Sequence, residues 1–114
     1  MTSAPHGLVI EADVEGDVLH VRVKGELDLS TTQQLTEALG AATDQPVEVV
    51  TLDLAEVSFI DSSGLRVLVL SGRALADAGR TLQIGPRSEM VSRVLTMTNL
   101  DNGGDAFDVL PESS

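Results

Sequence analysis

The chain has 114 residues, 42% of them hydrophobic, which is enough for one domain with a single core. Eighteen acidic residues against seven basic ones give a formal net charge of −11, which disfavours direct binding to nucleic acids and to anionic lipid surfaces. Cysteine is absent, which excludes disulfides and thiolate metal sites, and because Trp and Tyr are absent too, stacking on bases is not expected.

The N-terminal segment carries no targeting pattern. Residues 1–7 lack the basic and apolar regions of a signal peptide, and no apolar run approaches the length of a membrane span, so we expect a cytoplasmic protein. We expect residues 1–7 to be a flexible N-terminus and residues 111–114 to be a C-terminal tail. The domain is then predicted over residues 8–110.

Two β-branched runs, residues 8–14 and 18–23, predict the opening strands, because Glu15-Gly16-Asp17 between them has the composition of a hairpin turn. In the second run apolar and polar residues alternate, so one face of this strand is expected to be buried and the other solvated. His20 falls on the solvated face. We expect it to be a surface residue and not a general base, because nothing nearby supplies a nucleophile.

A helix is predicted over residues 30–42. Ser30 and Gln33 have the spacing of a capping box at its start. Its apolar stripe, at positions i, i+3, i+4 and i+7, consists of Leu35, Ala38, Leu39 and Ala42. Asp28 lies just before this helix. From the residues alone, Asp28 serves either the loop and the helix start or a function at the surface.

Residues 47–54 predict a central strand buried on both faces, because the run is almost continuously apolar, and this implies a sheet covered by helices. Residues 55–60 are then expected to be a connector. Three acids lie in or beside this connector, namely Asp53, Glu56 and Asp61. Their arrangement is more typical of a solvated connector than of a metal site.

The stretch from Asp61 to Gly64 is the candidate functional site. Asp, Ser, Ser and Gly in succession suit the start of a helix, because short polar side chains accept hydrogen bonds from the first free backbone N–H groups. One such residue is enough for a cap, whereas here two hydroxyls stand beside a carboxylate at the positive end of a helix dipole, and Gly64 leaves steric room. An exposed serine at this place is a candidate for phosphorylation.

The helix that follows is predicted over residues 62–78 and ends at Gly79. Its inner stripe comprises Leu65, Leu68, Val69, Gly72, Leu75 and Ala76, with Gly72 permitting close packing. A second, weaker apolar stripe comprises Val67, Leu70 and Ala74. This is more than one sheet face requires, so either a neighbouring helix or a partner is expected to cover it.

The rest of the chain predicts a fourth strand, a third helix and a short last strand. Residues 81–84 alternate before Gly85-Pro86 breaks the strand, and Ser88 caps the third helix. Residues 101–105 predict a turn that lacks the ligand spacing of a calcium loop. With a short strand over residues 107–110, the predicted fold is α/β, a mixed sheet of four to five strands with helices packed on it.

The chain resembles the anti-sigma factor antagonists of the STAS domain family (sulfate transporter and anti-sigma factor antagonist). Two motifs carry the resemblance, Phe59-Ile60-Asp61-Ser62-Ser63-Gly64-Leu65 and, upstream, Gly25-Glu26-Leu27-Asp28. The resemblance spans residues 8–110 and implies a single STAS domain. In this family the first serine of the motif is phosphorylated, and that position here is Ser62.

The resemblance implies a phospho-switch. The unphosphorylated chain is expected to bind an anti-sigma factor that is also an ATP-dependent serine kinase, so that a sigma factor is released. Phosphorylation of Ser62 ends binding, and a metal-dependent serine phosphatase restores it. ATP then belongs to the kinase, and the chain itself is expected to hold no cofactor and no metal. The partner-binding surface is expected to comprise Asp28, Asp61, Ser62, Ser63, Gly64 and Arg66.

The chain departs from the family near its end. A final helix usually follows the last strand, whereas this sequence stops at Ser114, which leaves the cover of one sheet face open and is compatible with a homodimer. The alternative function is that of a STAS subunit of a membrane transporter or lipid-trafficking complex. In that case Ser62 would be a helix cap only.

An enzyme is not expected, because no Gly-x-Ser-x-Gly elbow, Walker loop or His-Glu-x-x-His motif occurs. A serine hydrolase is disfavoured, since His6 and His20 both lie in the first fifth of the chain. A phospho-aspartate receiver competes structurally because Asp53 ends an apolar strand. Its chemistry needs a lysine after the last strand, however, and the only lysine here is Lys24.

Overall fold

The structure, a computed structural model, describes residues 7–102 and 104–111. The expected flexible N-terminus and C-terminal tail therefore lie almost entirely outside the described residues. In chain order the elements are β1 (Val9–Glu15), β2 (Val18–Leu27), α1 (Thr32–Ala41), the 3-10 turn η1 (Ala42–Asp44), β3 (Val49–Ile60), α2 (Ser62–Asp77), β4 (Thr81–Arg87), α3 (Glu89–Met97) and β5 (Asp108–Val109).

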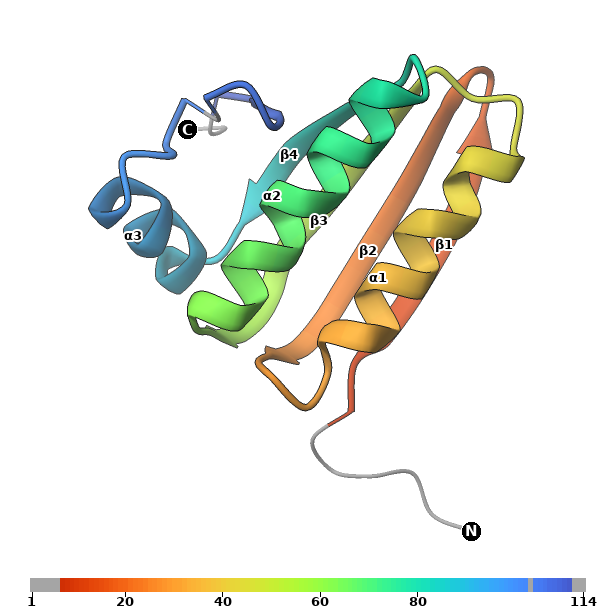
Figure 1. Ribbon diagram of the computed structural model, residues 1–114. Helices are drawn as coiled ribbons and strands as arrows, with labels where there is room; N and C mark the ends of the chain where they lie inside the picture. The colour runs from red at the N-terminus through yellow and green to blue at the C-terminus, as the bar shows by residue number, and fades with distance from the viewer. Residues whose placement is uncertain (1–6, 103, 112–114) are drawn as a thin grey trace, which may run out of the picture.

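The described strands form one mixed sheet in the order β1-β2-β3-β4-β5. The β1–β2 hairpin is antiparallel, and the three other pairs are parallel. Helices α1 and α2 lie on the same face of this sheet, while α3 lies beside the end of β4 (Figure 1). The α/β fold with a mixed sheet is thus confirmed.

The core lies between the sheet and the two helices on it. Alternate residues of the strands point into it, and so does one stripe of each helix. Among the most completely buried side chains are Val21, Val23, Leu52, Leu54, Leu35, Leu39, Leu68 and Leu75. Each such aliphatic side chain contributes about 1.5–3 kcal/mol by leaving water, so this layer is the main stabilising contact of the fold.

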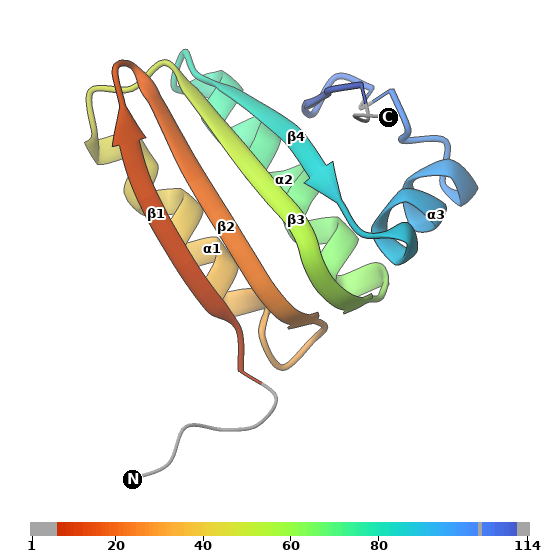
Figure 2. The same ribbon diagram turned by 180° about the vertical axis from the view of Figure 1, so that it is seen from behind.

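The expectation of a strand buried on both faces is wrong. In β3 the side chains of Val50, Leu52 and Leu54 are buried toward the helices, whereas Thr51 and Asp53 are only partly covered. Figure 2 shows the reason, because no helix crosses the far face of the sheet. The buried apolar residues of this run face the helices, and they alternate with residues such as Thr51 and Asp53 on the open face.

The predicted connector over residues 55–60 is also wrong, because β3 continues to Ile60. Strand β2 extends equally far, to Leu27, and pairs with this segment. The β2–β3 pairing contains two register shifts, one of them between Gly25 and Glu26. Beyond these shifts the two strands stay paired up to Leu27 and Ile60. The sequence predicted a connector here because bulges interrupt the alternation of apolar and polar residues by which a strand is identified.

Ion pairs cover the open face of the sheet. The Arg22 guanidinium lies 3.4 Å from a carboxylate oxygen of Glu11 and 3.7 Å from one of Asp53, and Lys24 Nζ lies 3.7 Å from Glu56. Each exposed pair contributes little stability, but together they make this face polar. His20 lies on the same face, as predicted, and is exposed.

Strand β4 does not break at Gly85-Pro86 as predicted but runs to Arg87. Its pairing with β3 shifts there, so that Gly85 and Pro86 together lie opposite Asp53 alone. Proline has no N–H to donate, and a bulge is one of the few sheet positions that needs none.

The helices and the last strand predicted over residues 62–110 are confirmed. Gly79 has φ +79° and ends α2, and the Ser88 hydroxyl accepts a hydrogen bond from Val91 N at 3.3 Å as the cap of α3. Turns follow over residues 101–102 and 104–106, and β5 pairs in parallel with β4. None of the helices in the described part of the chain has the length and apolar character of a membrane-spanning helix.

Gly72 tests how closely α2 packs on the C-terminal segment. A Cβ at this position would overlap the carbonyl group of Ala106, so Gly72→Ala is expected to destabilise the fold by about 1–3 kcal/mol through overpacking. Gly40 in α1 is the matched control, because a Cβ there meets nothing within 4 Å, and Gly40→Ala is expected to stabilise by about 0.5–1 kcal/mol. Urea unfolding of both variants measures the difference, and equal stability of the two would contradict this packing.

Candidate functional site

The two motifs meet because β2 and β3 run in parallel and end together. Leu27, the last residue of β2, pairs with Ile60, the last residue of β3. Immediately beyond, Asp61 N donates a hydrogen bond to Leu27 O at 3.3 Å. The loop after β2 and the start of α2 therefore lie side by side at one edge of the sheet (Figure 1).

Asp61 is the N-cap of α2. Its carboxylate accepts a hydrogen bond from Gly64 N at 3.0 Å, and its backbone is extended, as a cap requires. Ser62 and Ser63 are consequently the first two residues of the helix, and the alternative that Ser62 is itself the cap is wrong. The carboxylate of Asp61 reaches the third N–H of the helix, which leaves both hydroxyls free of that role.

The two serines differ in exposure. Ser62 is exposed, whereas Ser63 is partly buried. No described residue holds either hydroxyl in a hydrogen bond. Ser62 thus presents a free hydroxyl at the positive end of the α2 dipole, where an added phosphate would be favoured by roughly 0.3–1 kcal/mol.

Gly64 is buried and brings α2 close to β2. A Cβ on this residue would lie 2.5 Å from Leu27 O and 2.8 Å from Leu27 Cγ, distances that real Cβ atoms do not show. Gly64 therefore sets how near Ser62 lies to the loop after β2.

The carboxylate of Asp28 is held within its own loop. Its Oδ1 accepts hydrogen bonds from the Ser30 hydroxyl at 2.7 Å and from Ser30 N at 3.0 Å. The Ser30 hydroxyl is the main reason that the pKa of Asp28 lies below its ordinary value, with Ser30 N and Thr31 lowering it further. Asp28 thus shapes the loop in addition to any contact that it makes outside it.

The predicted capping box of Ser30 and Gln33 is wrong, because Ser30 is engaged by Asp28. Thr31 occupies the N-cap position of α1, without a side-chain cap bond, and it is the one polar residue buried among those described. Its hydroxyl donates to Glu26 O at 2.8 Å and accepts from Asp28 N at 3.0 Å. Thr31 therefore ties the loop to the end of β2, a role that its sequence position did not indicate.

Arg66 is exposed and lies one turn after Ser62 on the same side of α2. No hydrogen bond or ion pair joins its side chain to a described residue. The acids predicted beside this site are dispersed, since Asp53 faces the open side of the sheet while Asp61 caps α2. Within residues 7–102 and 104–111, no group of three potential ligands is placed to hold a metal ion.

Sequence reasoning missed three exposed apolar residues in segments at this edge of the sheet. Leu29 in the loop is 75% exposed, Phe59, the last residue but one of β3, is 40% exposed, and Met90 in the first turn of α3 is 37% exposed. No periodicity signals them, because Leu29 lies in an irregular loop and the other two lie next to element ends.

Comparison with known proteins finds a matching family model and similar proteins that share one kind of name. Residues 10–111 match the family model described as "Mlab, STAS domain". An anti-sigma-B factor antagonist of Staphylococcus epidermidis is 36% identical over 93 residues, which is 82% of this chain and 86% of that protein. The anti-sigma-F factor antagonist RsfB of Mycobacterium tuberculosis is 28% identical over 114 residues, covering 97% of this chain and 90% of the relative.

A solved structure agrees over nearly the whole chain. The crystal structure of an anti-sigma factor antagonist from Mycobacterium paratuberculosis superposes with a TM-score of 0.80 at 27% identity. The match covers 96% of this chain and 91% of that one. The similarity therefore includes the edge of the sheet at which Asp28 and Ser62 lie.

The pKa of Asp28 tests the loop geometry. Replacing Ser30→Ala removes the principal hydrogen bond and is expected to raise the Asp28 pKa toward its ordinary value of 3.8. Ser58→Ala is the matched control, because the Ser58 hydroxyl donates to Gly25 O and not to Asp28. Titration by carboxyl carbon NMR measures both variants.

The same shift predicts a pH dependence. Because the pKa of Asp28 is lower in the folded chain than its ordinary value of 3.8, ionised Asp28 stabilises the fold at pH values above 3.8. The stability that ionised Asp28 contributes is lost as the pH falls from 3.8 through the lower pKa of Asp28 in the folded chain. An Asp28 pKa that stays unchanged in Ser30→Ala would show that the loop is held in another way.

Proposed function

The chain belongs to the STAS domain family, and we propose that its function is that of an anti-sigma factor antagonist. The observation that carries this proposal is the free, exposed hydroxyl of Ser62 at the start of α2, beside the loop of Asp28. Curated relatives with which the chain shares 28–36% identity are named antagonists of anti-sigma factors. A regulatory binding protein, acting through one modifiable surface, fits both findings.

The partner in this proposal is an anti-sigma factor that is also a serine kinase. Capture of this partner by the unphosphorylated chain releases a sigma factor. The kinase binds ATP, the Ser62 oxygen attacks the γ-phosphorus, and ADP leaves while the hydroxyl proton passes to a base of the kinase. A metal-dependent phosphatase then adds water to the phosphoserine and returns serine and inorganic phosphate. With these partners, the chain is expected to act in the cytoplasm.

The phosphate ends capture by charge. A phosphoserine carries about −1.5 to −2 charges at neutral pH. A partner carboxylate about 5 Å away, at an effective dielectric of about 20, is repelled by roughly 3 kcal/mol per unit charge, or about a hundredfold in affinity. Nothing in this mechanism requires the fold to change, since the phosphate also meets the free N–H groups at the start of α2.

The alternative function, a subunit of a transporter or lipid-trafficking complex, is not favoured. The curated relatives from Staphylococcus and Mycobacterium are both named anti-sigma factor antagonists. Asp61 is the N-cap of α2, so the exposed Ser62 hydroxyl is not needed as the cap. In the antagonist mechanism this hydroxyl is the phosphate acceptor.

A homodimer stays a prediction. Strand β1 is an edge strand of the sheet, but Glu11, Asp13 and Glu15 lie along it. Antiparallel pairing with β1 of a second copy would bring these acids together. Strand β1 is therefore a poor surface for self-association. Sedimentation of the purified chain measures whether it forms a dimer through another surface.

The first test is the site of phosphate transfer. The kinase is obtained by affinity capture with Ser62→Ala as bait, a variant that cannot be released by phosphorylation. With this kinase and ATP, the wild-type chain is expected to gain one phosphate on Ser62, and mass spectrometry of the peptide around residues 59–66 locates it. Ser63→Ala is the control and should still be modified. Modification that persists in Ser62→Ala but is lost in Ser63→Ala would move the site by one residue.

The second test is the affinity of each form for the kinase. Phosphorylated chain is expected to bind about a hundredfold more weakly than unphosphorylated chain, from the charge repulsion estimated above. Ser62→Asp, with one charge and less bulk, should weaken binding less, and Ser62→Ala should bind as wild type does. Isothermal titration without ATP measures all four, and equal affinity of the two natural forms would refute the switch.

A further inference from the structure

The starting observation is the placement of large apolar side chains that remain in solvent. Among the described residues these are Val9, Val14, Leu29, Phe59, Leu70, Met90 and Met97. Three of them, Leu29, Phe59 and Met90, belong to segments at the carboxyl ends of β2, β3 and β4. This is the edge of the sheet at which Ser62 begins α2, so the three side chains come from different elements but share one end of the molecule.

Leu29 is exposed on a loop that is nevertheless held in place. The residues on both sides of it are fixed, because the Asp28 carboxylate binds Ser30 and the Thr31 hydroxyl binds Glu26 O. An apolar side chain that is 75% exposed on such a loop is presented to solvent in one position. Binding to it costs little ordering entropy, which is the property of an anchor residue at an interface.

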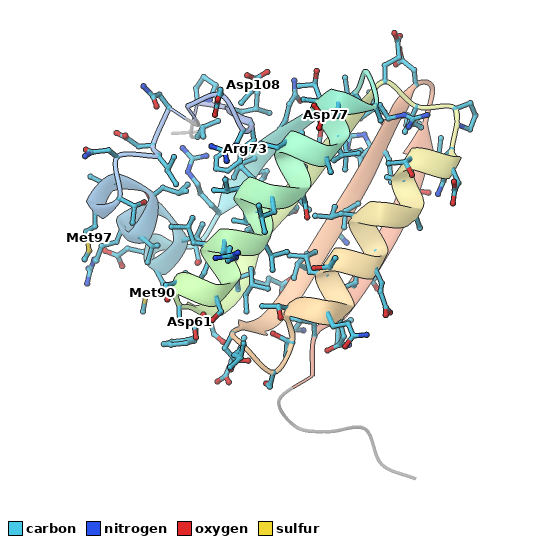
Figure 3. All side chains as sticks on the ribbon, viewed as in Figure 1. Asp61, Arg73, Asp77, Met90, Met97 and Asp108 are labelled. Carbon is cyan, nitrogen blue, oxygen red and sulfur yellow. The ribbon has the colours of Figure 1, made fainter. Side chains whose placement is uncertain are left out.

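Phe59 and Met90 belong to segments at the end of the sheet where α2 starts. Phe59 pairs with Glu26 in the β2–β3 ladder and precedes Ile60, the end of β3. Met90 is the second residue of α3, whose cap Ser88 donates its N–H to Leu54 O of β3. Figure 3 shows Met90 at the same end of the molecule as Asp61, whereas Met97 lies at the outer end of α3.

The charges beside these side chains are mostly negative. Asp28 is next to Leu29, Asp61 is two residues after Phe59, and Glu89 precedes Met90. Glu89 lies 3.7 Å from Arg93 in α3, and Arg66 in α2 is a second exposed base. A partner that fits this edge therefore presents an apolar surface with basic residues around it. Such a partner also suits the net charge of −11 of the whole chain.

We propose that Leu29, Phe59 and Met90 form an apolar contact surface around Ser62, and that the anti-sigma factor kinase covers it. This inference rests on the proposed function and adds the residues that supply its affinity. It also gives the phosphate a second effect, because a dianion in an apolar contact loses part of its hydration on binding. The occupant is the kinase because the surface adjoins the hydroxyl that the kinase must reach.

The chain supplies matched controls for this surface. Leu70 is 50% exposed, like Leu29 a leucine, and lies eight residues into α2 from Ser62, about 12 Å along the helix axis. Met97 is 74% exposed and lies in the same helix as Met90, about 10 Å further along. Each pair compares the same deletion of apolar atoms near Ser62 and away from it.

The experiment is titration of the purified kinase, without ATP, against alanine variants of the unphosphorylated chain. Leu29→Ala, Phe59→Ala and Met90→Ala are each expected to weaken binding about tenfold or more, as anchors at an interface do. Leu70→Ala and Met97→Ala are expected to change affinity less than about twofold, as is usual outside a contact surface. Thermal unfolding of each variant checks that the fold is intact, and Leu29→Gln replaces any Leu29→Ala sample that unfolds.

The outcomes separate this inference from the proposed function. Weakening confined to the three variants near Ser62 supports it. Wild-type affinity of these variants, with normal phosphate transfer to Ser62, overturns the apolar surface and leaves the antagonist function standing. A wild-type chain that neither binds nor receives phosphate overturns both. Sedimentation that shows a dimer dissociated by Leu29→Ala would identify a second copy as the occupant and overturn the kinase.

Discussion

The parallel pairing of β2 with β3 up to Leu27 and Ile60 is the constraint on which the site depends. It ends two strands at the same edge, so that the loop of Asp28 and the start of α2 meet although they are more than thirty residues apart in the chain. Gly64 completes this contact, because only a residue without a Cβ fits against Leu27 O. The position of Ser62 thus follows from backbone geometry and not from contacts of its own side chain.

Two carboxylates at this edge are used to satisfy backbone groups. Asp61 accepts from Gly64 N, and Asp28 accepts from Ser30 N. Both would otherwise be free acceptors beside Ser62, and both instead hold the segments that surround it. A site built in this way is ordered before a partner arrives, which lowers the entropy lost on binding. It also leaves the Ser62 hydroxyl exposed, with no hydrogen bond to a described residue.

The sheet separates two surfaces with different properties. One face packs on α1 and α2 and contains the core, whereas the other carries ion pairs such as Arg22 with Glu11 (Figure 2). Because the open face is polar, it needs no further layer to be stable in water. Three of the exposed apolar residues, Leu29, Phe59 and Met90, belong instead to segments at the edge where α2 starts. Exposed apolar surface of this kind is typical of binding sites.

The sequence by itself determined the α/β class, the helix that starts at Ser62 and the motif of Asp61 to Gly64, because these depend on local periodicity and capping chemistry. It misplaced the ends of β2, β3 and β4, since bulges at Gly25 and Pro86 interrupt the alternation that marks a strand. Only the tertiary structure decided that the loop of Asp28 meets the start of α2, that one sheet face stays open, and that Leu29 is exposed. Each of these depends on which strands pair and where they end, and such long-range pairing leaves no mark in a local pattern of residues.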